Sequence, residues 1–431
     1  MSALEVVTER LLALYYPVRE LRGAPPSEGV YVVVCNHPNG LLDPLLVRLL
    51  LRRRPGFLAK STFWDNPLGR WAMESSGAMP VYRAQEADTS KNERTFQRCR
   101  DLLKGGRWLA LFPEGTSHSS PTLLALKTGA ARIALSTLAE APDLPLRVLP
   151  IGVFYEDKAV FRSRAAGTIG APIPVADLLA DYRVDPRRAV DRLTERIEQG
   201  LGAVVLQGET EELRRAFYAV AGWVQARAGT AGGAAPRGDV AEREARAREL
   251  AERWAESDDM HRGAAVAAFQ QFERRMAELG VQDPLAVLDP DPPRVLARTL
   301  GLLALAPIAA VGAVLGWLPY RAVRPIASRM ARGNTDVEAT LKVLLGLVVM
   351  TSNYLGIALV AGLAAGPGWG LELLMVGPLS GYMALRFDER WALRVEALRG
   401  LWLARDADVR DAMAREREAL VRAISPAASP R

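Results

Sequence analysis

A histidine followed six positions later by an aspartate is the first feature of this chain that could do chemistry. The stretch reads CNHPNGLLDPLL (35–46), and His37 is one of only three histidines in 431 residues. A carboxylate that holds one imidazole nitrogen fixes the tautomer and leaves the other nitrogen as a base. No G-x-S-x-G nucleophile elbow supports a serine hydrolase. What remains is a base that deprotonates a substrate hydroxyl directly, although for this stretch taken alone a histidine that caps a loop is the safer interpretation.

The residues around this pair predict a strand, a short loop and a helix. Residues 31–35 form an apolar run rich in β-branched side chains, which is typical of a buried parallel strand, and a helical pattern with Pro44 in its first turn follows. Open α/β sheets bind ligands at the carboxyl ends of their strands. We therefore expect His37 at the mouth of a sheet, with Asp43 turned back towards the imidazole.

Strand and helix patterns alternate along the first two hundred residues. Further strands are predicted at 56–59, 79–82, 108–112 and 148–155, and helices at 66–75, 91–104 and 123–139. This alternation predicts an α/β domain with a mainly parallel sheet flanked by helices. Residues 1–23 have no signal-peptide layout and are predicted to form an amphipathic helix, with Leu4, Val7, Leu11 and Leu12 at helical spacing.

Two more predicted strands end in residues that suit a polar substrate. The stretch SGAMPVYR brings Arg83 to the end of a strand, and LFPEGTSHSSP (111–121) brings Glu114, Gly115 and Thr116 to the end of another. Gly115 permits a close approach of the backbone, while Glu114 and Thr116 offer polar groups to a polyol. These residue types favour a hydroxylated, charged substrate.

The predicted strand at 148–155 is followed by a basic segment that could hold an anion. Arg162 and Arg164 are two positions apart, so in an extended segment both point to the same side. A guanidinium matches a phosphate in bidentate fashion, although a solvated basic loop explains the same two residues equally well. Lys60, after the second strand, is a weaker candidate for the same pocket.

Together, these strand-end segments resemble the four-block signature of the glycerolipid acyltransferases, the family that includes glycerol-3-phosphate and lysophosphatidate acyltransferases. The residues NH…D, FPEGT and LPIG agree in order and spacing, over roughly residues 5–180. The resemblance implies that His37 is the general base and that Asp43 orients it. It also implies that the acceptor hydroxyl attacks a thioester carbonyl without a covalent acyl-enzyme.

The resemblance further implies a pocket for a phosphorylated glycerol-type acceptor. Its glycerol backbone would be held by Glu114, Gly115 and Thr116, and its phosphate by Arg83, with Arg162, Arg164 and Lys60 as further candidates. The donor would be an acyl-CoA or acyl carrier protein thioester, and neither a cofactor nor a metal is implied. The two cysteines, Cys35 and Cys99, have no disulfide or metal-binding pattern and are expected to be inert.

Two departures from the common family pattern point to one branch. Five residues separate His37 from Asp43 where the common pattern has four, and Ser117 and His118 stand where an arginine is usual. Both departures resemble the branch that acylates glycerol 3-phosphate or dihydroxyacetone phosphate, as in the fungal enzymes of that type. The second departure puts the phosphate-binding arginine of the third block in doubt. His118 itself is interpreted as a polar loop residue and His261 as a surface helix residue.

Charge and hydropathy favour a membrane surface over nucleic acid as the partner. The net charge is +6, but basic and acidic residues are interleaved and hydrophobic segments lie nearby. We predict an acyltransferase domain at 1–205, a charged helical region at 206–294 with a Gly/Ala-rich linker at 226–239, a hydrophobic membrane region at 295–387 and a helical tail at 388–431.

Two charge-free runs, of 22 and 29 residues, are long enough for membrane helices, which need about 20. The stretch 343–385 is predicted to cross twice and to turn at AAGPGWG, which leaves the basic loop 321–342 and the tail cytoplasmic. A straight crossing at 299–320 would separate the catalytic domain from that loop. We therefore predict a re-entrant or interfacial segment, broken near Pro307 and Gly312. A buried hairpin in a soluble domain is the alternative.

The sequence thus predicts an acyltransferase at the cytoplasmic membrane, with its catalytic domain facing the cytoplasm. It would acylate the sn-1 hydroxyl of glycerol 3-phosphate, or dihydroxyacetone phosphate, in phospholipid biosynthesis. A lysophosphatidate or other lysophospholipid acyltransferase shares all four motifs and is the alternative within the class. A non-catalytic lipid-binding membrane scaffold is the alternative of another class, although intact His37, Asp43 and Glu114 speak against it.

Overall fold

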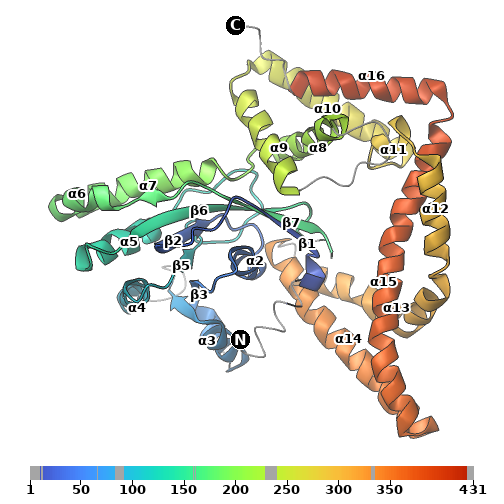
Figure 1. Ribbon diagram of the computed structural model, residues 1–431, viewed down its shortest axis with the longest axis horizontal. Helices are drawn as coiled ribbons and strands as arrows, with labels where there is room; N and C mark the ends of the chain where they lie inside the picture. The colour runs from blue at the N-terminus through green and yellow to red at the C-terminus, as the bar shows by residue number, and fades with distance from the viewer. Residues whose placement is uncertain are drawn as a thin grey trace. The chain divides into compact units, whose positions relative to one another are not determined.

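Figure 1 shows the computed structural model of the chain. The structure describes residue 10 and residues 13–65, 67–82, 92–158, 160, 162–228, 240–331 and 335–424. The chain divides into two compact units. The first comprises Met1–Arg214, Asp239–Arg248 and Thr335–Thr340, and the second comprises Arg215–Gly238, Glu249–Asn334 and Leu341–Arg431.

The first unit is built on a mainly parallel sheet. Its strands are β1 (Val18–Arg22), β2 (Val30–Cys35), β3 (Gly56–Lys60), β4 (Ala78–Val81), β5 (Leu109–Leu111), β6 (Leu146–Tyr155), β7 (Arg164–Ile169) and β8 (Ile173–Pro174). They lie in the order β1-β7-β6-β2-β5-β3-β4, with β8 paired to β6. Only β7 and β8 run antiparallel to β6, while every other described pair is parallel. The predicted fold class is confirmed.

Helices connect these strands and cover the sheet. They are α2 (Leu42–Leu51), α3 (Pro67–Ser76), α4 (Asn92–Lys104), α5 (Gly129–Glu140), α6 (Leu179–Val184) and α7 (Pro186–Gly202), with 3-10 turns η1 (Ser61–Asp65) and η3 (Ala176–Leu178). The helix predicted at 123–139 begins only at Gly129. The N–H groups of Leu123 and Leu124 instead donate to the side chains of Gln207 and Glu114, which holds this stretch as a loop.

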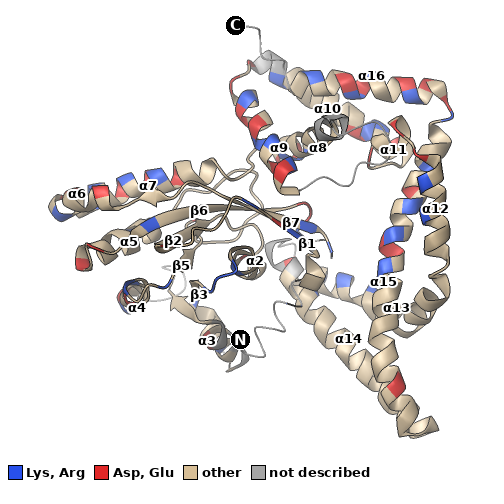
Figure 2. Cartoon of the chain, viewed as in Figure 1, with Lys and Arg blue, Asp and Glu red and all other residues tan. Residues whose placement is uncertain are grey.

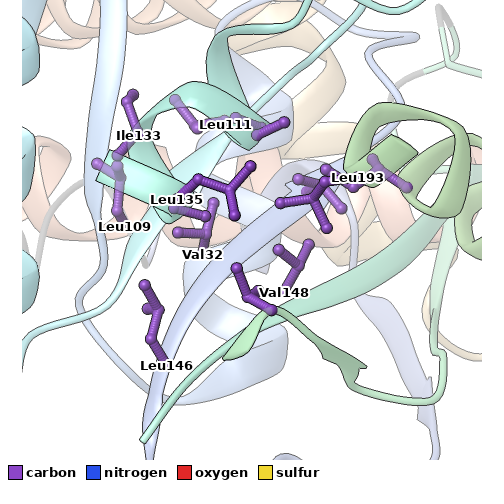
Figure 3. Packing of buried hydrophobic residues seen from close by; sticks show 14 of the residues in the cluster. Val32, Leu109, Leu111, Ile133, Leu135, Leu146, Val148 and Leu193 are labelled. Carbon is purple, nitrogen blue, oxygen red and sulfur yellow. The ribbon is translucent and has the colours of Figure 1, made fainter. Parts of the chain in front are cut away.

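The central strand β2 is buried along its whole length. It lies between β5 and β6 and is parallel to both, so a continuous apolar run suits it better than an alternating one. On one face, Val32 packs with Leu109, Val148 and side chains of α5 and α7 in the main core cluster (Figure 3). This packing fixes the end of β2 from which the His37 loop leaves.

The N-terminal segment differs from its prediction. Residues 18–22 form β1 and pair in parallel with β7, whereas a helix was predicted over 1–23. Pro17 explains the change, because proline cannot donate the hydrogen bond that would continue a helix. The predicted apolar face of Leu4, Val7, Leu11 and Leu12 lies outside the described residues, as does most of the predicted linker at 226–239.

The second unit is helical over its described residues. The remaining helices, of which α8, α9 and α14 begin in the first unit, are α8 (Glu211–Ala228), α9 (Val240–Ala255), α10 (Asp259–Leu279), α11 (Leu285–Leu288), α12 (Pro292–Leu303), α13 (Ala306–Ala331), α14 (Thr335–Ala365), α15 (Pro367–Leu403) and α16 (Ala407–Ile424). Helices 306–331 and 340–365 are long and apolar enough to cross a membrane. The apolar window of the second is only 6% buried, unlike the core helix of a soluble protein. Figure 2 shows how few charges α14 carries.

The helix boundary predicted at AAGPGWG is present, whereas the two membrane crossings on either side of it stay a prediction. Helix α14 ends at Ala365 and α15 begins at Pro367, with Gly366 between them at φ +102°. The break predicted in 299–320 lies at residues 304–305, ahead of Pro307 and Gly312, and 306–331 is one continuous helix. Pro307 lies in the first turn of α13, where proline is tolerated, and Gly312 stays helical.

Glycines bring three helices of the second unit into close contact. A side chain at Gly312 of α13 would overlap the carbonyl oxygen of Ser380 in α15. The ring of Tyr354 in α14 lies against Gly377 of α15, where an added Cβ would be 2.9 Å from Cδ1. Small residues that let helix backbones approach are characteristic of membrane helix packing. Gly312 is therefore a contact point rather than a helix breaker.

Candidate active site

The candidate site lies along one edge of the sheet. The parallel strands β6, β2 and β5 are neighbours, so their carboxyl ends meet at the same edge. Tyr155 ends β6, His37 follows β2, and Glu114 follows β5. The amino end of the antiparallel β7 reaches this edge too, because Tyr155 is paired with Ala165. The edge therefore gathers groups from three motifs that are distant in sequence.

His37 and Asp43 form the predicted pair. His37 Nδ1 lies 2.8 Å from Asp43 Oδ2, and the same oxygen accepts a hydrogen bond from Asn39 N at 2.7 Å. The Asp43 side chain is completely buried, whereas the His37 side chain is 15% exposed. Asp43 thus holds the imidazole at Nδ1, and Nε2 has no partner among the residues that the structure describes. This nitrogen is the one that a substrate could meet.

A turn accommodates the fifth residue between His37 and Asp43. Leu42 N donates to Asn39 O at 3.0 Å, and Gly40 adopts φ +48°, which glycine adopts at little cost. Helix α2 then begins at once, with Asp43 in its first turn. The longer spacing leaves the imidazole–carboxylate contact intact.

Tyr155 supports the carboxylate from the other side. Its hydroxyl donates to Asp43 Oδ1 at 2.6 Å, in a buried setting. Burial, reinforced by the negative charge of Asp43, raises the pKa of Tyr155 well above its ordinary value. The phenol therefore stays protonated and remains a donor at neutral pH. No role in the site was predicted for Tyr155, because the aromatic end of the strand VLPIGVFY is its only local signal in the sequence.

The other face of the loop is held by Tyr16 and Asn36. Tyr16 donates to Lys158 O at 2.9 Å and accepts from Asn39 Nδ2 at 2.7 Å. Burial is also the main cause that raises the pKa of Tyr16. Asn36 makes a reciprocal pair with the backbone of Val153, at 3.0 and 2.7 Å. The residue before His37 is thereby fixed to β6.

The His37 ring is also fixed by stacking. The ring of Phe112, just beyond β5, lies parallel to it with centroids 4.1 Å apart and an interplanar angle of 17°. A ring stacked on one face and hydrogen-bonded at Nδ1 has little rotational freedom left. Phe112 is the F of FPEGT, and no role was predicted for it. The apolar neighbour belongs to the same motif as Glu114.

Glu114 is engaged by the protein, whereas its predicted role was to hold the acceptor. Oε2 accepts from His37 N at 2.7 Å, and Oε1 contacts His118 Nε2 at 2.6 Å and accepts from Leu124 N at 3.2 Å. Its side chain is completely buried. Because donors from this chain occupy both oxygens, the carboxylate ties the FPEGT loop to the His37 loop. Gly115, at φ +74°, and Thr116 are exposed beside it.

Lys158 is a second residue of the site that was not predicted. It follows β6, and Nζ donates to Pro38 O at 2.8 Å and to Ser119 Oγ at 2.6 Å. This ammonium group therefore joins the loops that carry His37 and His118. A lysine in the loop EDKAVF has no local pattern that separates it from a solvated charge. Its role follows only from the pairing of strands that brings the loops together.

The predicted anion ligands fare differently. Arg83 lies outside the described residues and stays a prediction. Lys60 ends β3, at the same edge of the sheet as His37. Arg162 has a left-handed backbone, φ +64°, so the premise that it shares one side of an extended segment with Arg164 is wrong. The guanidinium of Arg164, in β7, is nearly buried and lies 3.5 Å from Glu20 and 3.9 Å from Glu156.

The two cysteines and the grouping of metal-ligating residues were predicted to play no part in the chemistry. Among the described residues, no group of three or more His, Cys, Asp or Glu could hold a metal ion. Cys35 and Cys99 are both buried. Burial raises the pKa of both thiols, to about 12 for Cys99, so both stay protonated at neutral pH.

Residues 18–152 match the family model described as Acyltransferase. The chain is 37% identical over 119 residues to glycerol-3-phosphate O-acyltransferase 2 of Saccharomyces cerevisiae, covering 27% of this chain and 16% of that protein. It is 30% identical over 139 residues to a chloroplastic 1-acyl-sn-glycerol-3-phosphate acyltransferase of Arabidopsis thaliana, covering 31% and 38%. The solved 1-acyl-sn-glycerophosphate acyltransferase of Thermotoga maritima aligns over 46% of this chain and 80% of that one, at 18% identity and a TM-score of 0.32.

The chain spans less than two fifths of the length of either curated relative. The family match nevertheless covers β1 to β5 and most of β6, with His37, Asp43 and Glu114 inside it. These are the residues that the sequence and the structure place together at the sheet edge. Residues 18–152 therefore form a domain that matches the Acyltransferase family model, and its relatives among the glycerol-3-phosphate and 1-acyl-sn-glycerol-3-phosphate acyltransferases are consistent with the glycerolipid acyltransferase family.

Proposed function

We propose that this protein is a membrane-associated O-acyltransferase. It transfers a fatty acyl group from a thioester to the sn-1 hydroxyl of glycerol 3-phosphate, or to the hydroxyl of dihydroxyacetone phosphate, in phospholipid biosynthesis. The observation that carries this proposal is the pair formed by a buried Asp43 and a partly exposed His37, 2.8 Å apart at the sheet edge. A non-catalytic scaffold gains nothing from a buried carboxylate that orients an accessible imidazole.

The reaction follows from the geometry of the pair. Nε2 of His37 takes the proton of the acceptor hydroxyl while the hydroxyl oxygen bonds to the thioester carbonyl carbon. The tetrahedral intermediate then collapses, the carbon–sulfur bond breaks, and Nε2 returns the proton to the leaving sulfur. The products are an ester and a free thiol, so the imidazole is regenerated. Asp43 stabilises the imidazolium that exists between these two proton transfers.

Two acceptor classes are supported, and the first is favoured. The yeast relative is named for glycerol 3-phosphate, and the five-residue spacing and the Ser117-His118 pair resemble that branch. The chloroplastic relatives are named for 1-acyl-sn-glycerol 3-phosphate, which supports a lysophosphatidate acyltransferase as the second candidate. The donor, acyl-CoA or acyl carrier protein thioester, is common to both.

The membrane part of the proposal rests on the helices of the second unit. Large apolar side chains stand exposed on α14 and on the first half of α15, including Leu363 at 81% and Met375 at 78%. Lipid tails would cover them at no cost in hydrogen bonds. We infer that these two helices cross the cytoplasmic membrane as a hairpin and that the acyltransferase domain faces the cytoplasm, where thioester donors are made.

The proposed function is tested with isolated membranes that contain the full chain. Radiolabelled acyl-CoA is supplied with glycerol 3-phosphate, dihydroxyacetone phosphate or a lysophosphatidate, and the labelled lipids are separated. We expect label in the monoacyl products of the first two acceptors. Label only in phosphatidate would establish the second candidate. No incorporation with any acceptor, from acyl-CoA or acyl carrier protein, would contradict the enzyme.

Arg83→Ala is expected to raise KM for the phosphorylated acceptor by about 10- to 100-fold and to leave KM for the donor almost unchanged. The physical reason is the loss of a charged hydrogen bond, worth about 1.5–3 kcal/mol. Steady-state kinetics with each substrate varied in turn measures both values. Arg98→Ala, which removes an exposed arginine from α4, is the matched control. An equal rise for donor and acceptor would assign Arg83 to the fold or to the donor phosphates.

The hairpin is tested with single cysteines at Trp369, beside the turn, and at Ala407, after α15. Both residues are exposed, and the native cysteines are buried. In sealed vesicles, a membrane-impermeant maleimide should label Trp369→Cys from the non-cytoplasmic side and Ala407→Cys from the cytoplasmic side. Trp71→Cys, on an exposed residue of α3, should be labelled from the cytoplasmic side, like Ala407→Cys. Labelling of all three positions from the same side would contradict the hairpin.

A further inference from the structure

We propose that His118 is a positioning residue of the transfer reaction. Its imidazole holds the Glu114 carboxylate, and that carboxylate holds the main chain of His37. The inference rests on the proposed function, because it assigns His118 to the same reaction. The sequence predicted only a polar loop residue at this position.

Three hydrogen bonds form a closed ring around His37. His37 N donates to Glu114 Oε2 at 2.7 Å, and Glu114 Oε1 lies 2.6 Å from His118 Nε2. The ring closes where His118 N donates to His37 O at 3.1 Å. Both main-chain groups of His37 are therefore fixed by the pair His118 and Glu114. The side chain of His37 leaves this ring and is oriented separately by Asp43.

The side chains of this hydrogen-bond ring are largely shielded from water. The Glu114 side chain is fully buried, and that of His118 is only 17% exposed. A hydrogen bond in such surroundings is stronger than the same bond in water, and an unmet carboxylate oxygen there is costly. Removing the His118 imidazole would leave one such oxygen with Leu124 N as its remaining donor, at 3.2 Å.

The neighbouring backbone assigns the tautomer of His118. Ser120 N donates to His118 Nδ1 at 3.1 Å, so Nδ1 carries a lone pair and is unprotonated. Nε2 therefore carries the proton and donates a hydrogen bond to Glu114 Oε1. A guanidinium at this position could not do both, because it only donates. The histidine therefore folds its own loop and holds Glu114 at the same time.

A second set of contacts presses the same loop onto His37. Lys158 Nζ donates to Ser119 Oγ at 2.6 Å, and it also donates to Pro38 O at 2.8 Å. These two acceptors are the residues that follow His118 and His37 in the chain. The loop that carries His118 is thus attached to the His37 loop at two independent places, which favours a positioning role over a chance contact.

The kinetic test compares three variants of the full chain in membranes. His118→Ala should lower kcat by about 10- to 100-fold, since a small misplacement of a reacting group can cost ~10²-fold. KM for acceptor and donor should stay within about twofold of wild type. His118→Gln keeps an N–H at the position of Nε2 and should recover most of kcat. His261→Ala, which removes the histidine of α10, is the matched control and should match the wild type.

A spectroscopic test does not depend on activity. With only three histidines in the chain, uniformly labelled [15N]histidine gives three imidazoles, which His118→Gln and His261→Ala assign. In the full chain in detergent micelles, His118 should show a protonated Nε2 and an unprotonated Nδ1. The opposite tautomer would overturn the inference, whatever the protein turns out to catalyse.

The kinetic outcomes also separate the inference from the proposed function. An inactive wild type with the expected tautomer would contradict the function and leave the hydrogen-bond ring standing. An active wild type whose His118→Ala variant keeps full kcat would overturn the inference alone. A selective rise in acceptor KM at unchanged kcat would also overturn it, because His118 would then bind the substrate. Failure of His118→Gln to recover kcat would remove the assigned role of the Nε2 proton.

Discussion

Replacing His37 with alanine is expected to lower kcat by about 10²–10⁴-fold, the usual contribution of a positioned general base. Asp43 holds Nδ1 of this imidazole at 2.8 Å, and Nε2 has no partner among the described residues. Without it, the acceptor hydroxyl must lose its proton to water. Transfer of a labelled acyl group to glycerol 3-phosphate under saturating substrates measures the loss.

The fold should survive this change. Glu114 and His118 contact the main chain of His37, and alanine keeps both of those hydrogen bonds. The amount of protein in the membrane and its unfolding temperature in detergent should therefore stay close to the wild type. His37→Gln provides a sharper comparison, because it restores a polar side chain without a base and should be as inactive as His37→Ala. A glutamine variant with wild-type turnover would remove the mechanism.

Replacing Gly312 with valine is expected to disrupt the helical unit. At this point of α13 any Cβ would overlap the carbonyl oxygen of Ser380 in α15, and a backbone cannot move aside as a flexible side chain can. Overpacking of a close contact typically costs about 1–3 kcal/mol and sometimes more. We expect the variant to give little monodisperse protein in detergent and a clearly lower unfolding temperature.

Gly356→Val is the matched control for this prediction. Gly356 lies in α14, within the same apolar region, and a Cβ there would meet nothing within 4 Å. The same substitution should therefore be tolerated, and size-exclusion profile and unfolding temperature should match the wild type. If both variants behaved alike, the close crossing of α13 and α15 would not hold the unit together.

The centre of the site could be predicted because its signals are local. A strand buried on both faces must be a continuous apolar run, and β2 and the part of β6 after Arg147 are such runs. His37 and Asp43 lie on one loop, so a short turn is enough to join them. Those parts of the fold follow from residues that are neighbours in the chain.

The remaining parts depend on contacts that the local pattern does not contain. Tyr155 meets Asp43 across 112 positions of sequence, and only the pairing of β6 with β2 brings them together. Strand β7, RAAGTI, has small side chains and takes its strand form from β1 and β6 on either side. The contact of Gly312 with α15 is likewise invisible without the partner helix. In each case a neighbour in space decides the outcome.

The strand order sets the smallest fragment that could work on its own. The family match ends at residue 152, inside β6, yet Tyr155 and Lys158 lie beyond that point. Strand β1 is paired only with β7 in the described sheet, so a piece cut at 152 would also release β1 and the adjacent Tyr16. A self-sufficient domain must therefore extend past β8 and α7. A polypeptide that ends where the family match ends would contain the base His37 and its partner Asp43. It would lack Tyr155, whose hydroxyl donates to Asp43.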